Sequence, residues 1–350
     1  MKNTVNFNEL QLFADGNFNT NVTTQGTPND LTAELKTFYD TELLENARVE
    51  MFYAQFGKKQ NLPANHGKTV EWRKWNTFAK ANELQEGVIP DGQKFGMTSK
   101  NGAINQYGTY ATVSDVLELR AYDDIILGAT EEMGASAAET QEKLIRDALL
   151  TNTNVLYCDN ITLSTGAVAG TPTKPGDMEA STSAMSLLTP DMVAKAVTKM
   201  KKDRVPTING KYYAVIHPSV AYDLRKSEAW VEAHKYAATA EIFNGEIGEL
   251  HGVRFIENVF APILAGDYAN KATTKTYATY FFGKDAFGII DPEGGALEMI
   301  VKDKSQIGGP LNQYSTIGYK FETNGATILY TERVLRVMSC STFSATDEAN

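Results

Sequence analysis

Residues 103–151 read AINQYGTYATVSDVLELRAYDDIILGATEEMGASAAETQEKLIRDALLT, and the hydrophobic periodicity changes within this stretch. Up to Asp115, β-branched and aromatic residues fall at roughly alternate positions, which is typical of a strand. From Ala121 to about Thr151, apolar residues recur near helical spacing with no proline between them, which predicts a helix roughly 45 Å long. Seven acidic and two basic residues give this predicted helix half of the chain's net charge of −10.

A second strand-like run, KTVEWRKWNTF at 68–78, precedes this stretch. Residues 79–102 between the two runs contain turn signals, among them Pro90-Asp91-Gly92 and Asn101-Gly102. The simplest interpretation is a pair of antiparallel strands, 68–78 and 103–115, with a long excursion at the tip. A lone two-stranded ribbon is only marginally stable in water, so we expect this one to lie on another surface, such as another subunit.

The N-terminal segment has little to bury. Residues 14–30 are rich in Asn and Thr and predict a polar arm. Before it, Leu10, Leu12 and Phe13 form a small apolar plug that needs a docking surface. A helix is predicted from Asp30, which can cap it, to Gly57.

The later segments mix helices and strands. Residues 160–188 predict a loop or weak strands, and Thr189-Pro190-Asp191 predicts the start of a helix that runs to about Asp203. KYYAVIH at 211–217 predicts a strand, followed by a short helix. From Gly252 onward strand-like runs dominate, and Asn324-Gly325 predicts a tight hairpin between two of them. The class predicted is α+β.

Composition excludes several classes of protein. The chain has 350 residues, of which 42% are hydrophobic, and its 16 Tyr, 16 Phe and 3 Trp argue against wholesale disorder. No apolar run is long enough for a membrane span, and the acidic balance argues against a dedicated nucleic-acid binder. Cys158 and Cys340 form no close pair, and the N-terminus does not read as a signal peptide, so we expect a protein made in a reducing cytoplasm.

No catalytic constellation emerges from the sequence. His66-Gly67-Lys68-Thr69 lacks the upstream glycine and the following helix of a phosphate-binding loop. The histidines are too far apart to form a zinc site, and no local signature supports Cys158 as a nucleophile. We therefore expect no enzyme activity, no metal and no cofactor.

Two clusters of basic residues suggest contact surfaces. Lys195, Lys199 and Lys202 share one face of the predicted 190–203 helix, which is either a site for acidic groups of another subunit or simply a solvated face. In Trp72-Arg73-Lys74-Trp75, two cations lie between two large aromatics, a pattern that suits nucleic acid or a protein interface. The acidic total favours protein contact.

The order of several segments carries a resemblance. These segments are TVEWRKWNTF, GVIPDG, INQYGTYATVSDVLELRAYDD, VIHPSVAYDLR, GELHGVRFIENV, FFGKDAFGIID and YTERVLRV. Together they resemble the major capsid proteins of tailed bacteriophages, which share the Hong Kong phage fold, and more narrowly the coat-protein family typified by phage N-four. The resemblance covers residues 30–340.

The resemblance implies a division of the chain. It places an N-terminal arm and first helix at 1–66, an extended β-ribbon loop at 67–119, and the spine helix of a peripheral domain at 120–159. An axial domain follows at 160–275, and 276–350 form a β-rich return through the peripheral domain with a C-terminal tail.

The resemblance also implies partners and a place in the virion. Hexamers and pentamers of this chain would close an icosahedral shell around double-stranded DNA, touched without sequence preference and without any membrane. We expect assembly in the bacterial cytoplasm with a portal, decoration proteins in some cases, and a separate scaffolding protein, because only about 30 residues precede the first predicted helix. The residues expected at inter-subunit contacts are Leu10, Leu12, Phe13, Trp72, Arg73, Lys74, Trp75, Pro90, Asp91, Lys195, Lys199 and Lys202.

Two other functions stay open at this point. One is the shell of an encapsulin-like bacterial nanocompartment, which has the same fold and carries an enzyme inside. The other is a conventional soluble α+β enzyme, although the sequence offers no catalytic group for it.

Overall fold

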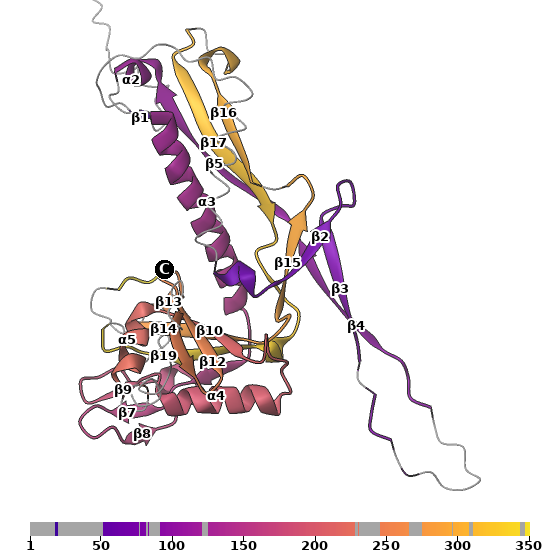
Figure 1. The fold of residues 1–350 in the computed structure, drawn as a ribbon, viewed down its shortest axis with the longest axis vertical. Helices are drawn as coiled ribbons and strands as arrows, with labels where there is room; N and C mark the ends of the chain where they lie inside the picture. Colours follow the sequence, from indigo (N-terminus) through magenta and orange to yellow (C-terminus); the bar gives the residue numbers. More distant parts are fainter. Residues whose placement is uncertain are drawn as a thin grey trace, which may run out of the picture.

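The computed structural model describes residues 18–19, 52–76, 78–81, 83, 92–120, 125–227, 230, 246–265, 275–295, 297–307, 311–343 and 347–350. Figure 1 shows three parts: an elongated layer of one helix against a sheet, a compact body built on a second sheet, and a projecting ribbon. Apart from Phe18 and Asn19, the predicted arm lies outside the described residues, as do most of the helix predicted between Asp30 and Gly57 and the turn at Pro90-Asp91.

The elongated layer contains the stretch quoted first. Helix α3 (Ile125–Leu150) confirms the predicted spine helix. It packs on a sheet with strand order β1-β5-β17-β16. The strands are β1 (Phe18–Asn19), β5 (Asn105–Ser114), β17 (Tyr314–Thr323) and β16 (Glu298–Lys302), and the short α2 (Asp115–Arg120) joins β5 to the region before α3. Met133 and Ala137 of the helix are buried in one cluster with Ile317 and Phe321 of β17.

The compact body has a seven-stranded sheet at its centre. Its strands are β11 (Glu246–Leu250), β12 (Val253–Glu257), β10 (Tyr212–Ile216), β14 (Thr276–Phe282), β19 (Val334–Ser339), β6 (Val155–Tyr157) and β13 (Ile263–Leu264). Every residue of β14 is buried. The helices α4 (Pro190–Lys202) and α5 (Pro218–Lys226) place their apolar faces in the largest buried cluster, together with residues of this sheet.

The C-terminal end of α3 packs against the seven-stranded sheet. Ile145 and Leu149 share a buried cluster with Tyr280 and Phe282 of β14. The Arg336 guanidinium of β19 donates to the carbonyl of Leu150 over 2.6 Å, where the helix leaves its last carbonyls without partners and its dipole favours a cation. One helix therefore fixes the position of both sheets.

In the ribbon, the strand predicted at 68–78 is present, but it pairs with a different strand from the one predicted. β3 (Thr69–Trp75) pairs antiparallel with β4 (Met97–Ala103), not with residues 103–115. The latter form β5, which pairs with β17 over ten residues on the spine sheet. The turn predicted at Asn101-Gly102 is wrong, because both residues lie within β4. Gly102 instead leaves room for the Trp72 ring, which would lie 2.8 Å from an added Cβ.

Smaller elements complete the fold. β15 (Phe287–Pro292) lies between β2 (Lys58–Leu62) and β18 (Thr327–Ile328) at the root of the ribbon. A separate sheet of β7 (Asn160–Thr162), β8 (Val168–Gly170) and β9 (Ala184–Ser186) flanks α4, in the segment predicted as loop or weak strands. Short 3-10 turns are η2 (Tyr53–Gln55), η3 (Pro175–Asp177), η5 (Lys304–Gln306) and η6 (Thr331–Arg333).

Local signals identified helix starts correctly but not the hairpin. The Thr189 hydroxyl accepts from the Met192 amide and caps α4, as predicted. The hairpin predicted at Asn324-Gly325 is wrong, because β5 and β16 already occupy both edges of β17. The Asn324 side chain instead accepts from the Ile290 amide over 2.8 Å, and the chain continues into β18 beside β15.

A buried carboxyl group ties the chain before the ribbon to the spine helix. Glu142 of α3 is only 1% exposed and accepts from the amides of Phe52 and Tyr53, the latter over 3.1 Å. Burial raises the pKa of Glu142 from 4.5 to about 7, although these two hydrogen bonds act to lower it. The folded protein therefore holds this proton more tightly than the unfolded chain does.

This shift predicts a pH-dependent stability. As pH rises from about 4.5 to about 7, the free energy of unfolding should lose up to about 3 kcal/mol from this group, and Glu142→Gln should remove that loss. Denaturation of the dilute protomer at pH 5 and pH 8 measures it. Glu139→Gln, an exposed carboxylate of the same helix, is the matched control. Equal pH dependence in the wild type and in Glu142→Gln would contradict the assignment.

Candidate inter-subunit surface

The root of the ribbon is fixed by one indole ring. The side chains of Val70 and Trp72 point to the same face of β3 and pack with a small cluster that contains Leu62 and Ile290. A Cβ added at Gly288 would lie 2.7 Å from the Trp72 ring, and one at Gly102 would lie 2.8 Å from it. Two glycines therefore leave the space in which this ring joins β3 to β15.

Two cations, Lys74 and Arg333, lie over the Tyr330 ring beside the root of the ribbon. Lys74 pairs with Glu332 over 3.5 Å, and its ammonium lies 4.5 Å from the centre of the Tyr330 ring. Arg333 stacks on the same ring at 3.6 Å and donates to the Lys284 carbonyl. Arg73 pairs with Glu71 on the opposite face of β3.

The far part of the ribbon exposes apolar side chains. Trp75 is 59% exposed, and it contacts Phe95, which is 65% exposed, with a centroid separation of 4.3 Å. Phe78 lies 5.4 Å from Phe95, and Met97 is the strand partner of Trp75. We call Trp75, Phe78, Phe95 and Met97 the aromatic tip. Exposed apolar groups gathered in this way mark an interaction surface more often than a solvated one.

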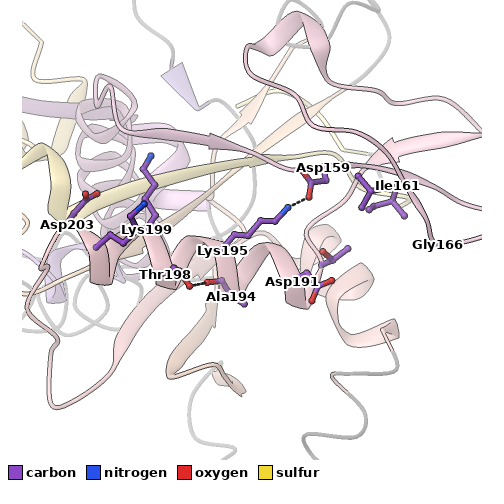
Figure 2. Close-up of a pocket in the computed structure, with 12 residues that line it drawn as sticks. Asp159, Ile161, Gly166, Asp191, Ala194, Lys195, Thr198, Lys199 and Asp203 are labelled. Carbon is purple, nitrogen blue, oxygen red and sulfur yellow. Dashed lines mark hydrogen bonds and ion pairs between the residues drawn. The ribbon is translucent and has the colours of Figure 1, made fainter.

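The lysines of α4 lie on a separate surface, in the compact body. Figure 2 shows a groove between α4 and the β7–β8 hairpin, with a volume of about 800 Å³. Lys195 forms an ion pair with Asp159, whose side chain is almost fully buried. The groove is lined by three lysines and three aspartates, Lys195, Lys199, Lys202, Asp159, Asp191 and Asp203, so its charges balance.

The structure thus separates the predicted contact residues. Trp72, Arg73, Lys74 and Trp75 are together on the ribbon, but Trp72 packs within its own chain while Trp75 faces outward. Lys195, Lys199 and Lys202 share the outer face of α4, opposite buried residues, and their contact with another subunit stays a prediction. Leu10, Leu12, Phe13, Pro90 and Asp91 lie outside the described residues.

Sequence reasoning missed three members of the aromatic tip and Tyr330. Phe95 and Met97 come from the segment 79–102, interpreted as an excursion rich in turns, and Phe78 ends the run predicted as a strand. The sequence did contain a signal for an interaction surface here, because isolated apolar residues in an otherwise polar loop cannot form a core of their own. Tyr330 gave no signal, because its role depends on a contact with a strand more than 250 residues away.

The groups considered for chemistry have structural places. Residues 66–69 form the turn into β3, as predicted. His217 is buried and caps α5 by accepting from the Ser219 amide. Both cysteines are free and buried, and burial raises the pKa of Cys340 to about 12. Among the described residues no cluster of three or more metal-ligating side chains occurs. No described helix is long and apolar enough to cross a membrane.

Filling the space beside Trp72 should loosen the ribbon. Gly288→Ala places a methyl group against the indole, and overpacking of this kind costs about 1–3 kcal/mol. We expect a lower Tm and faster proteolysis within residues 67–103. Gly176→Ala, where the added Cβ meets no atom within 4 Å, should match the wild type. A Gly288→Ala protein with wild-type Tm and cleavage rate would show that the contact does not hold the ribbon.

Comparison with known proteins agrees with this architecture. A family model described as phage capsid protein matches residues 98–326. The capsid of Ralstonia phage GP4 is 13% identical with a TM-score of 0.61, covering 85% of this chain and 93% of that chain. The cyanophage Pam1 capsid asymmetric unit gives 12% identity and a TM-score of 0.62, again with 85% and 93% coverage.

The head structure of Helicobacter pylori bacteriophage KHP40 extends the likeness over nearly the whole chain. It is 11% identical with a TM-score of 0.57 and covers 97% of this chain and 98% of that chain. Identities this low show a shared fold, which confirms the predicted α+β class and the Hong Kong phage architecture. Comparison with curated protein sequences gives no match.

Proposed function

This chain belongs to the phage capsid protein family and is a phage major capsid protein, and we propose that the aromatic tip of its ribbon joins neighbouring copies in the shell. The observation that carries the proposal is the exposure of four large apolar side chains on a segment that projects from the body. Water contact with these groups is unfavourable by roughly 25 cal/mol per Å² of apolar surface. In a shell, each subunit lies beside other copies of the chain, and the surface of such a copy can cover these apolar groups.

The ribbon suits this role because its root packs against the body of the protomer and the apolar side chains of its tip are exposed. The root is fixed by Trp72, so the tip reaches a neighbour from a defined direction. Many small contacts of this kind, repeated around a closed shell, hold each subunit at several sites at once. In this proposal the chain divides into an N-terminal arm and first helix at 1–66, an extended β-ribbon loop at 67–119 and the spine helix of a peripheral domain at 120–159. An axial domain spans 160–275, and 276–350 form the β-rich return and C-terminal tail.

Further partners follow from the same proposal. Hexamers and pentamers of the chain would form an icosahedral shell around double-stranded DNA, with a separate scaffolding protein and a portal. Assembly would take place in the host cytoplasm, and the subunit would have no enzymatic role. The family match favours this phage shell over the bacterial nanocompartment alternative.

Polar substitution of the tip tests the proposal. Trp75→Ser with Phe95→Ser should leave the protomer folded, because neither side chain belongs to a buried cluster, yet it should reduce shell yield by about tenfold or more. Negative-stain microscopy and sedimentation of the purified protein, expressed with the products of neighbouring genes, measure the yield.

A matched control uses exposed apolar residues elsewhere. Val259→Ser with Leu311→Ser changes side chains that are 67% and 73% exposed, and shells should form normally. If the tip variant assembles as well as this control and the wild type, the ribbon does not join the copies. If the wild-type chain forms no shells with its neighbouring gene products, the proposed self-assembly is wrong.

A further inference from the structure

The spine helix carries a row of acidic side chains that its own fold does not use. Glu131, Ala135 and Glu139 are spaced four residues apart and therefore lie on one side of α3, with Glu132 next to them. All four residues are exposed, whereas Met133 and Ala137 are buried against the sheet. We call Glu131, Glu132 and Glu139 the acidic row. None of the three has a charged partner within the part of the chain that the structure describes.

A hollow of about 410 Å³ at the root of the ribbon has the opposite character. Strands β2, β3 and β4 and the turn η6 line it with five basic side chains against three acidic ones, Glu71, Asp285 and Glu332. We call the five basic residues, Lys58, Arg73, Lys74, Lys100 and Arg333, the basic hollow.

Three of these five cations, Lys58, Lys100 and Arg333, form no ion pair among the described residues, while the third acidic side chain, Asp285, is also unpaired there. Arg73 pairs with Glu71 and Lys74 with Glu332. Lys58 and Lys100 are exposed, and no ion pair to either occurs among the described residues. The hollow thus keeps a surplus of two positive charges, which favours an acidic partner.

The groove on α4 is a weaker candidate for the same partner. It is lined by as many aspartates as lysines, and Lys195 is already paired with Asp159. An acidic surface entering that groove would meet as many like charges as opposite ones. The basic hollow has no such balance, so charge complementarity selects it.

We propose that the acidic row of α3 in one copy docks on the basic hollow of a second copy. This inference rests on the proposed function, since it requires copies that lie side by side in a shell. The contact joins two different surfaces, so each copy can offer its row to one neighbour and its hollow to another, as a ring or shell requires. Complementary charges of this kind fix the register of the copies and speed their encounter.

Charge reversal tests the contact. One variant combines Glu132→Lys with Glu139→Lys, a second combines Lys58→Glu with Lys100→Glu, and a third combines all four substitutions. In low salt, each of the first two should reduce shell yield by about tenfold or more, because like charges meet across the contact, and the third should recover most of it. Circular dichroism of the protomers checks that every variant folds.

Reversal of charges elsewhere is the control. Lys226→Glu with Glu348→Lys changes two exposed residues outside both surfaces and should leave shell yield within about twofold of the wild type. Wild-type yield in the first two variants would overturn the inference while leaving the shell function intact. So would a fourfold variant that assembles no better than they do.

Nucleic acid is the other polyanion that could enter the hollow. If Lys58→Glu with Lys100→Glu forms normal shells but retains less DNA, the hollow serves DNA and the proposed contact is wrong. Absence of shells from the wild-type chain is a separate outcome, because it would refute the proposed self-assembly and this inference with it.

Discussion

The structure depends on the burial of one helix against two sheets. Near its start α3 packs Met133 and Ala137 on β17, and near its end it packs Ile145 and Leu149 beside β14. Since 26 residues of helix span about 39 Å, this rod sets the separation of the two bodies. The guanidinium of Arg336 adds a hydrogen bond to the Leu150 carbonyl at the end of the helix. A subunit of a closed shell needs such rigidity, because small angular errors add up around the shell.

The ribbon obeys a different constraint, in that it cannot bury its own apolar groups. Successive side chains of a strand point to opposite faces. Trp72 therefore enters the small core at the root, while Trp75, three positions later, lies on the other face of β3 and contacts Phe95. The packed root and the exposed tip therefore follow from the alternation of side chains along β3 and from the two glycines that leave space for the Trp72 ring.

Local physics in the sequence predicted local structure well, and long-range pairing poorly. The spine helix, the Thr189 cap and the strand before His217 follow from periodicity and capping within a few residues. The partner of β5 does not, because β17 lies about 200 residues further on, whereas the nearer strand β3 was the partner predicted from the sequence and pairs instead with β4. The hairpin predicted at Asn324-Gly325 failed for the same reason. The strands β5 and β16, which are distant in sequence or not adjacent to this turn, already pair with both edges of β17. Among the candidate contact residues, the type of Trp75 was enough to predict a contact surface. That Trp72 packs within its own chain while Trp75 is exposed could not be predicted, because it depends on the space that Gly288 leaves for the Trp72 ring.

In the proposed shell, neighbouring copies bury the aromatic tip. A cryo-electron microscopy reconstruction of the assembled shell tests it most directly, because it shows what surrounds Trp75, Phe78 and Phe95. We predict that all three rings lie against another copy with their solvent exposure largely lost. Rings that remain open to solvent in the closed shell would contradict the claim.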